Sequence, residues 1–154
     1  MIRALLALGV VLAGAGPPAA GMPALSRTQT LYETRCGGCH GIEGISSPRA
    51  VPSLQGQVGY FLCVPAGRAY LVRVPGVALS LIREDGDLAD VMNFVVFALG
   101  AGSTPAGTPP YTAAEIARLR QAPLDAATLP ADRSALVEQA IRDCGAPAAL
   151  RDYR

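Results

Sequence analysis

Residues 36–40, Cys-Gly-Gly-Cys-His, restrict the fold most, because they combine two of the four cysteines with the chain's only histidine. The spacing C-x-x-C-H is the signature of covalent haem attachment. Two thiols at this spacing can add to the two vinyl groups on one edge of a porphyrin, and the residue that follows is then placed under the iron. The sequence therefore predicts one covalently bound haem c, attached through Cys36 and Cys39 and ligated by His40.

Three other uses of these residues compete with haem attachment. A dithiol redox motif needs no histidine and usually lies in a strand–helix unit, which the sequence does not predict here. A zinc site needs four ligands, and the remaining cysteines, Cys63 and Cys144, are single and distant. A structural disulfide between Cys36 and Cys39 leaves His40 unexplained.

The N-terminal residues 1–21 have the composition of a secretory signal peptide, with one arginine, an apolar run and then small residues. The alternative is a membrane anchor, but the run is short of the roughly 20 residues that span a bilayer. We expect cleavage near Ala20 to Ala24, export to a bacterial periplasm, and no membrane association afterwards. In that oxidising compartment Cys63 either pairs with Cys144 or is buried as a small apolar side chain.

The charge balance restricts the choice of partners. The chain has no lysine, and without Arg3 its arginines equal its twelve acidic residues in number. A neutral polypeptide without a basic patch is a poor partner for nucleic acid or for an anionic membrane.

The hydrophobic pattern predicts helices separated by loops. Ser26 and Thr112 are predicted N-caps, the latter with Glu115 at capping-box spacing, and Gly145 is a predicted helix end. Residues 68–74 fit a helix or an extended segment, 41–67 have the glycine and proline content of loops, and 101–110 have the composition of a linker. The predicted helices cover residues 26–35, 86–100, 111–121 and 130–145.

Residues 26–100 resemble the small class I c-type cytochromes in three motifs that occur in the family's order. Tyr32 lies four positions before the first cysteine of C-x-x-C-H, the segment Pro52-Ser-Leu54-Gln-Gly matches the family's P-x-L-x-G, and Val-Met-Asn-Phe94-Val matches its closing helix. The resemblance implies an all-α, class I cytochrome c-like fold in which short helices and loops wrap around one haem.

The resemblance also implies roles for individual residues. The carbonyl of Pro52 would accept the N–H of His40 and thereby fix the tautomer of this ligand. Pro52 and Leu54 are candidate haem-binding residues, and Phe94 would pack across Tyr32.

The family's distal methionine is missing. Val74 takes its place in the usual Met-Pro pair, and Pro75 is retained. Met92 and Cys63 are candidate substitutes, but Met92 lies within a predicted helix as a packing residue. The distal ligand is thus open, and five-coordinate or water-ligated iron is an alternative. Arg68 and Arg73 are either partners of the haem propionates or surface arginines.

These features divide the chain into the signal peptide, a cytochrome domain at 22–100, and a linker with a helical extension at 101–154. The resemblance implies a one-electron carrier, not an enzyme, that exchanges electrons with a donor dehydrogenase and an acceptor protein. Two alternatives remain: a haem protein with an open distal site that binds ligands or reacts with peroxide, and a haem subunit of a larger dehydrogenase.

Overall fold

The structure, a computed structural model, describes residues 25–46 and 51–153, and regular structure in these ranges is entirely helical. The predicted signal peptide lies outside them. Among the described helices, none combines the length and apolar character required to cross a bilayer. In chain order the elements are α1 (Arg27–Arg35), α2 (Gly37–His40), the 3₁₀-helix η1 (Val58–Cys63), α3 (Pro65–Arg73), α4 (Pro75–Ala78), α5 (Asp85–Asn93), the π-helical η2 (Phe94–Leu99), α6 (Ala113–Leu119), α7 (Leu129–Cys144) and the 3₁₀-helix η3 (Ala148–Asp152).

Helix α1 packs on the closing helix as the resemblance implies. Ser26 caps α1, and its side chain and that of Gln29 form a reciprocal capping box. Tyr32 is fully buried, and its ring meets that of Phe94 edge-on with centroids 5.3 Å apart. This aromatic contact fixes α1, and with it the start of the C-x-x-C-H motif, against the end of α5.

The middle of the chain is more helical than its glycine and proline content predicts. Of residues 68–74, all but Val74 are helical, because α3 begins at Pro65 and ends at Arg73. Pro65 at the first helical position costs no hydrogen bond, since that N–H has no partner within a helix. Val74 separates α3 from α4 and has extended backbone angles, as is usual before a proline.

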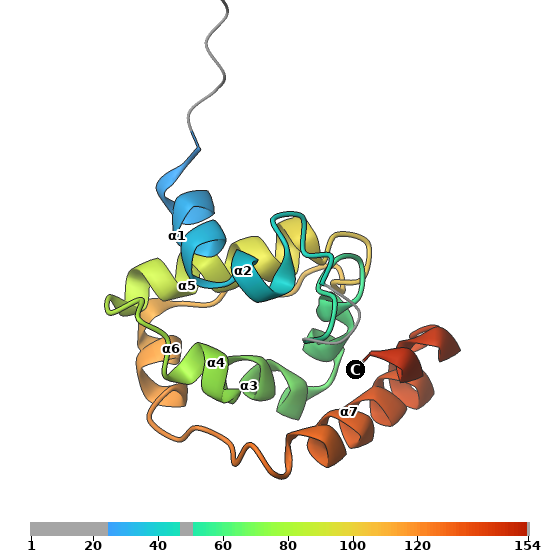
Figure 1. Cartoon of the computed structure of the whole chain (residues 1–154). Helices are drawn as coiled ribbons and strands as arrows, with labels where there is room; N and C mark the ends of the chain where they lie inside the picture. Colours follow the sequence, from blue (N-terminus) through green and yellow to red (C-terminus); the bar gives the residue numbers. More distant parts are fainter. Residues whose placement is uncertain (1–24, 47–50, 154) are drawn as a thin grey trace, which may run out of the picture.

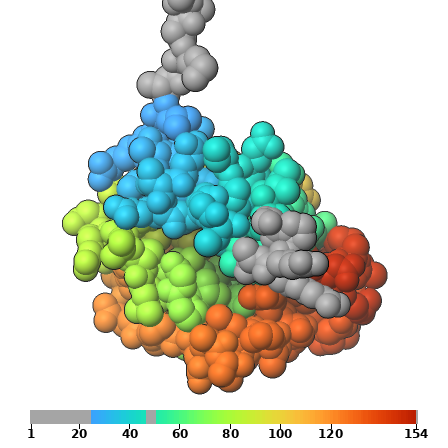
Figure 2. All heavy atoms as spheres, in the orientation of Figure 1, coloured from blue at the N-terminus to red at the C-terminus, as the bar shows by residue number. Residues whose placement is uncertain are grey.

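The C-terminal residues share the hydrophobic core with the rest of the chain. One cluster of buried side chains joins Tyr32 and Phe61 to Tyr111, Ile116 and Leu150. In Figure 1 α6 lies beside the N-terminal end of α5, and α7 runs along the opposite side of α3. Figure 2 shows the residues beyond about 110, in orange and red, along the lower and right-hand edges of this face.

The predicted linker is fixed in place at its start. Gly59 approaches Thr104 so closely that a Cβ on this glycine would lie 2.3 Å from the backbone nitrogen of Thr104. The Ser103 hydroxyl, which is buried, accepts a hydrogen bond from the Gly59 N–H and donates one to the Gly100 carbonyl. These contacts attach the linker to η1, so its composition alone is a poor guide to its conformation.

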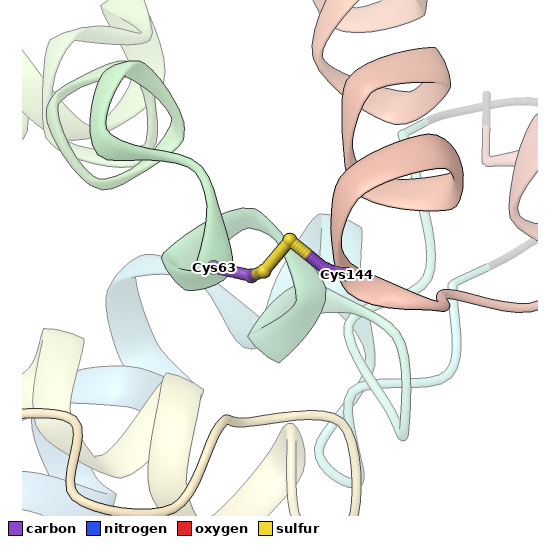
Figure 3. The surroundings of a disulfide bond; sticks show 2 residues. All are labelled: Cys63 and Cys144. Carbon is purple, nitrogen blue, oxygen red and sulfur yellow. A yellow bond between two sulfur atoms is a disulfide. The ribbon is translucent and has the colours of Figure 1, made fainter.

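A disulfide attaches the C-terminal helix to the centre of the chain. Cys63, the last residue of η1, is bonded to Cys144, the last residue of α7, with their Cα atoms 6.3 Å apart. Figure 3 shows the bond bridging these two helix ends. Of the two uses expected for Cys63, the structure supports the pairing with Cys144.

Candidate functional site

The cysteines of the C-x-x-C-H motif lie at the junction of α1 and α2. Cys36 is the C-cap of α1, with its N–H donating to the Tyr32 carbonyl at 2.8 Å, and its own carbonyl accepts the N–H of His40 at 3.0 Å. Cys36 and Cys39 are both free thiols, the first half-buried and the second exposed. Burial and the neighbouring Cys39 raise the pKa of the Cys36 thiol. One helical turn therefore presents two unpaired thiols and the only imidazole of the chain.

The imidazole of His40 is oriented by a backbone carbonyl. Its Nδ1 lies 3.1 Å from the carbonyl oxygen of Pro52. Because a carbonyl only accepts, Nδ1 must carry the proton of this bond, and the lone pair of the neutral ring is then on Nε2. Burial lowers the pKa of His40, against the opposing effect of this hydrogen bond, and so favours the neutral ring.

Further hydrogen bonds hold Pro52 and the residues that follow it in position. The hydroxyl of Ser46 donates to the same oxygen at 2.9 Å. The carbonyl of Gly44 accepts the N–H of Leu54 at 2.7 Å and the hydroxyl of Ser53 at 2.9 Å. The segments on the two sides of residues 47–50 are therefore connected by hydrogen bonds.

Gly41 lets the chain turn directly after the histidine. Its φ angle is 74°, and a Cβ at this position would lie 2.3 Å from the carbonyl oxygen of Ile45. The carbonyl of Gly41 also accepts the hydroxyl of Tyr32 at 2.7 Å. A side chain at position 41 would displace the loop that carries the hydrogen bonds to Pro52.

The donor set fits a covalently attached haem. Two unpaired thiols precede an imidazole whose Nε2 lone pair is free, which is the chemistry that two thioether bonds and one axial iron bond require. Pro52 supports the imidazole, and Leu54 is buried in the adjoining core.

The surroundings of Cys63 and Met92 bear on whether either sulfur could be the distal ligand. Cys63 is bonded to Cys144, so its sulfur has no thiolate to offer. Met92 is the only methionine among residues 25–46 and 51–153, and its side chain is 4 % exposed within the core. Val74 is half-buried against the same core. The described residues place no sulfur ligand in the segment that usually carries one.

Arg68 and Arg73 both bind residues of the C-terminal extension. The Arg68 guanidinium forms a bidentate pair with Glu115, with both N–O distances at 2.7 Å, and lies 4.0 Å from the centre of the Tyr111 ring. The Arg73 Nε donates to the carbonyl of Ala122 at 2.7 Å. The sequence did not reveal these roles, because the partners lie more than forty residues away along the chain.

Arg120, a third arginine, was not predicted as a site residue. It lies at the end of α6 and donates to the carbonyls of Ala78 and Ile82, both at 3.2 Å, and to the Asp85 carboxylate at 2.9 Å. A longer contact of 3.4 Å reaches the carbonyl of Ser80. Its only sequence signal was the acidic Asp85, since backbone carbonyls have no residue-type signature.

Comparison with known proteins gives the family. No protein-family profile matches the chain. It is 31 % identical over 119 residues to cytochrome c-552 of Thermus thermophilus, a match that covers 66 % of this chain and 91 % of that protein. A second cytochrome c-552, from one strain of Thermus thermophilus, is also 31 % identical over 119 residues, and this match covers 80 % of that protein.

A third match is much less complete. It is 37 % identical over 78 residues to ubiquitin thioesterase OTU1 of Homo sapiens, but covers only 22 % of that protein and shows no family. The cytochrome c-552 matches cover most of their proteins and agree with the helical fold. The chain therefore belongs to the c-type cytochromes, electron-transfer proteins that carry covalently bound haem c.

Proposed function

We propose that this cytochrome is an exported one-electron carrier in which Cys36 and Cys39 form the thioether bonds and His40 is the proximal ligand. The observation that carries the proposal is the hydrogen bond from His40 Nδ1 to the Pro52 carbonyl, since it leaves Nε2 as the iron ligand. When bound, the haem supplies the redox centre. The polypeptide binds the haem at one turn, orients the imidazole and limits the access of water.

The proposal includes the cellular setting. The N-terminal residues 1–21 act as a signal peptide, and the mature protein is located in a bacterial periplasm. There it passes electrons between a donor dehydrogenase and an acceptor through small, transient contacts. The Cys63–Cys144 disulfide supports an oxidising compartment, because such bonds are rare where thiols are kept reduced.

The test is the state of the haem in the purified mature protein. We expect the haem to remain attached after denaturation and acid–acetone extraction, with a mass equal to the polypeptide plus one haem. A pyridine haemochrome spectrum should report two thioether bonds in the wild type and one in Cys39→Ala. Haem that is extracted from the wild type would refute the attachment, whereas native ligation in His40→Ala would refute the assigned ligand.

A second candidate function is the binding of small ligands at the distal face. It is supported by the pairing of Cys63 with Cys144, which removes one sulfur candidate, and by the position of Met92 inside α5. Carbon monoxide binding to the reduced protein discriminates between the functions, because a strongly held sixth ligand would oppose it.

A further inference from the structure

We propose that Arg120 positions the segment at residues 78–82 over the haem face opposite His40, and thereby limits the access of small ligands to the iron. This inference rests on the proposed function, because it requires a haem attached at Cys36 and Cys39. It assigns a role in the site to the C-terminal extension, whose residues lie outside the C-x-x-C-H motif and its flanks.

The backbone of this segment has few other partners. Helix α4 is a single turn that ends at Ala78, and the last carbonyls of a helix have no partner within it. No regular structure follows until α5 begins at Asp85. The hydrogen bonds that the described residues give to the carbonyls of Ala78, Ser80 and Ile82 come from Arg120.

The side chains of the segment give it little independent support. Ala78 and Ile82 are 4 % and 3 % exposed and act as anchors, but Leu79 and Leu81 are 67 % and 59 % exposed. The segment therefore depends on the buried side chains at its two ends, on the hydrogen bonds that the N–H groups of Leu79 and Ser80 give to α4, and on the planar donors of one guanidinium. An arginine suits this role because its donors diverge in a fixed fork, whereas a lysine has a single ammonium.

Arg120 is itself held firmly. It follows α6 directly, and the side chains of Ile116 and Leu119 fix this helix in the core at 0 % and 8 % exposure. The Arg120 side chain is only 14 % exposed, and its charge is balanced by Asp85. A well-fixed donor can position a loop, because moving the loop would leave partly buried polar groups without partners.

The segment begins on the side of the fold opposite α2. Figure 1 shows α2, which carries His40, and the α3–α4 pair on opposite sides of the ring of helices, with the chain after α4 rising along one edge of the ring to α5. A planar haem that is attached to α2 and ligated by His40 directs its other face away from Pro52. With Val74 at the start of α4 and no sulfur ligand in the described part of the chain nearby, residues 78–82 would restrict access from this side.

The experiment compares Arg120→Lys and Arg120→Gln with the wild-type holoprotein. Lysine retains the positive charge beside Asp85 but loses the fork that reaches the three carbonyls; glutamine loses both. The control is Arg151→Gln, which removes an arginine that is bidentate to Glu138, at distances of 2.6 and 2.9 Å, in the C-terminal part of the chain. Covalent haem content is measured first for every variant, so a failure of the proposed function is detected separately.

Three readouts are taken on each protein: amide hydrogen exchange at residues 79–82, the association rate of carbon monoxide with the reduced protein, and the reduction potential. In both Arg120 variants we expect faster amide hydrogen exchange and a carbon monoxide association rate that is higher by about fivefold. The loss of one net hydrogen bond changes the equilibrium for opening the segment by about this factor. The potential should fall, because a haem more open to water stabilises the ferric charge.

The lysine variant is decisive, because it separates positioning from charge. Wild-type rates and potential in Arg120→Lys would overturn the proposal, since the charge alone would then be sufficient. Equal changes in Arg151→Gln would also overturn it, because they would show general loosening. If Arg120→Gln gives no folded holoprotein, Arg120→Lys carries the test by itself. Altered hydrogen exchange with unaltered ligand access would refute the connection to the iron.

Discussion

Removing the Cys63–Cys144 disulfide should strongly destabilise the protein without changing its haem site. The two cysteines are 81 positions apart. For a loop of about 80 residues, the chain-entropy relation gives a stabilisation of about 4.5 kcal/mol through the unfolded state. The attachment cysteines, Cys36 and Cys39, precede this loop, so the covalent haem neither shortens nor crosses it.

The double variant Cys63→Ala/Cys144→Ala is the suitable perturbation, because a single variant leaves an unpaired thiol that could compete during haem attachment. Denaturation by guanidinium, followed by circular dichroism, should show a free energy of unfolding lower by about 2–5 kcal/mol, the range observed for native disulfides. Wild-type protein in reductant is the control that retains both sulfur atoms. The haem spectrum should not change.

Two results would refute this reasoning. A loss below about 1 kcal/mol in the double variant would mean that the bond does not constrain the unfolded chain as the loop length predicts. A changed axial-ligand spectrum would mean that Cys63 acts at the iron and not in the pairing shown in Figure 3.

Three further predictions concern single side chains. Val74→Met should convert high-spin ferric iron to low-spin, raise the reduction potential and weaken carbon monoxide binding, because a thioether favours ferrous iron; an unchanged spectrum would show that this residue does not approach the haem. Met92→Leu should cost under ~1.5 kcal/mol and leave the spectrum unchanged, since it conserves volume in the core; loss of a sulfur-to-iron charge-transfer band would identify Met92 as the distal ligand. Glu115→Gln should lower the free energy of unfolding by about 1 kcal/mol at neutral pH, since the hydrogen bonds from Arg68 are charge-assisted but only partly buried. Because Arg68 lowers the pKa of this carboxyl, the difference in free energy of unfolding between the wild type and Glu115→Gln should persist above the unfolded-state pKa and disappear as the pH falls through the folded-state pKa. A difference that is independent of pH in denaturation curves would contradict the ion pair.

Much of the site could be predicted because its chemistry is local. The three residues of C-x-x-C-H lie within one turn, and the capping of α1 by Ser26 depends on residues three positions apart. Gly145 ends α7 with a φ angle of 67°, as its residue type predicts. The expected hydrogen bond between His40 and Pro52 is present, although it spans a loop, because a recognisable motif accompanies it.

At the Thr112 cap, local spacing predicts one of the two expected hydrogen bonds correctly and the other incorrectly. Its hydroxyl accepts the N–H of Glu115, as the spacing predicts. The Glu115 carboxylate, however, does not return to the cap but binds Arg68, 47 positions earlier. A charged partner with a fixed fork competes better for the carboxylate than a single backbone N–H does.

The sequence by itself determined the haem chemistry, the helical class and most helix ends, because each depends on residues within a turn or two of one another. The tertiary structure alone decided which cysteine pairs with Cys144, that Met92 is enclosed in the core, and that Arg68 and Arg120 bind carboxylates and carbonyls of distant segments. These outcomes depend on which helix faces meet when the apolar surface is buried, and the backbone carbonyls that two of the arginines bind are identical at every position of the chain.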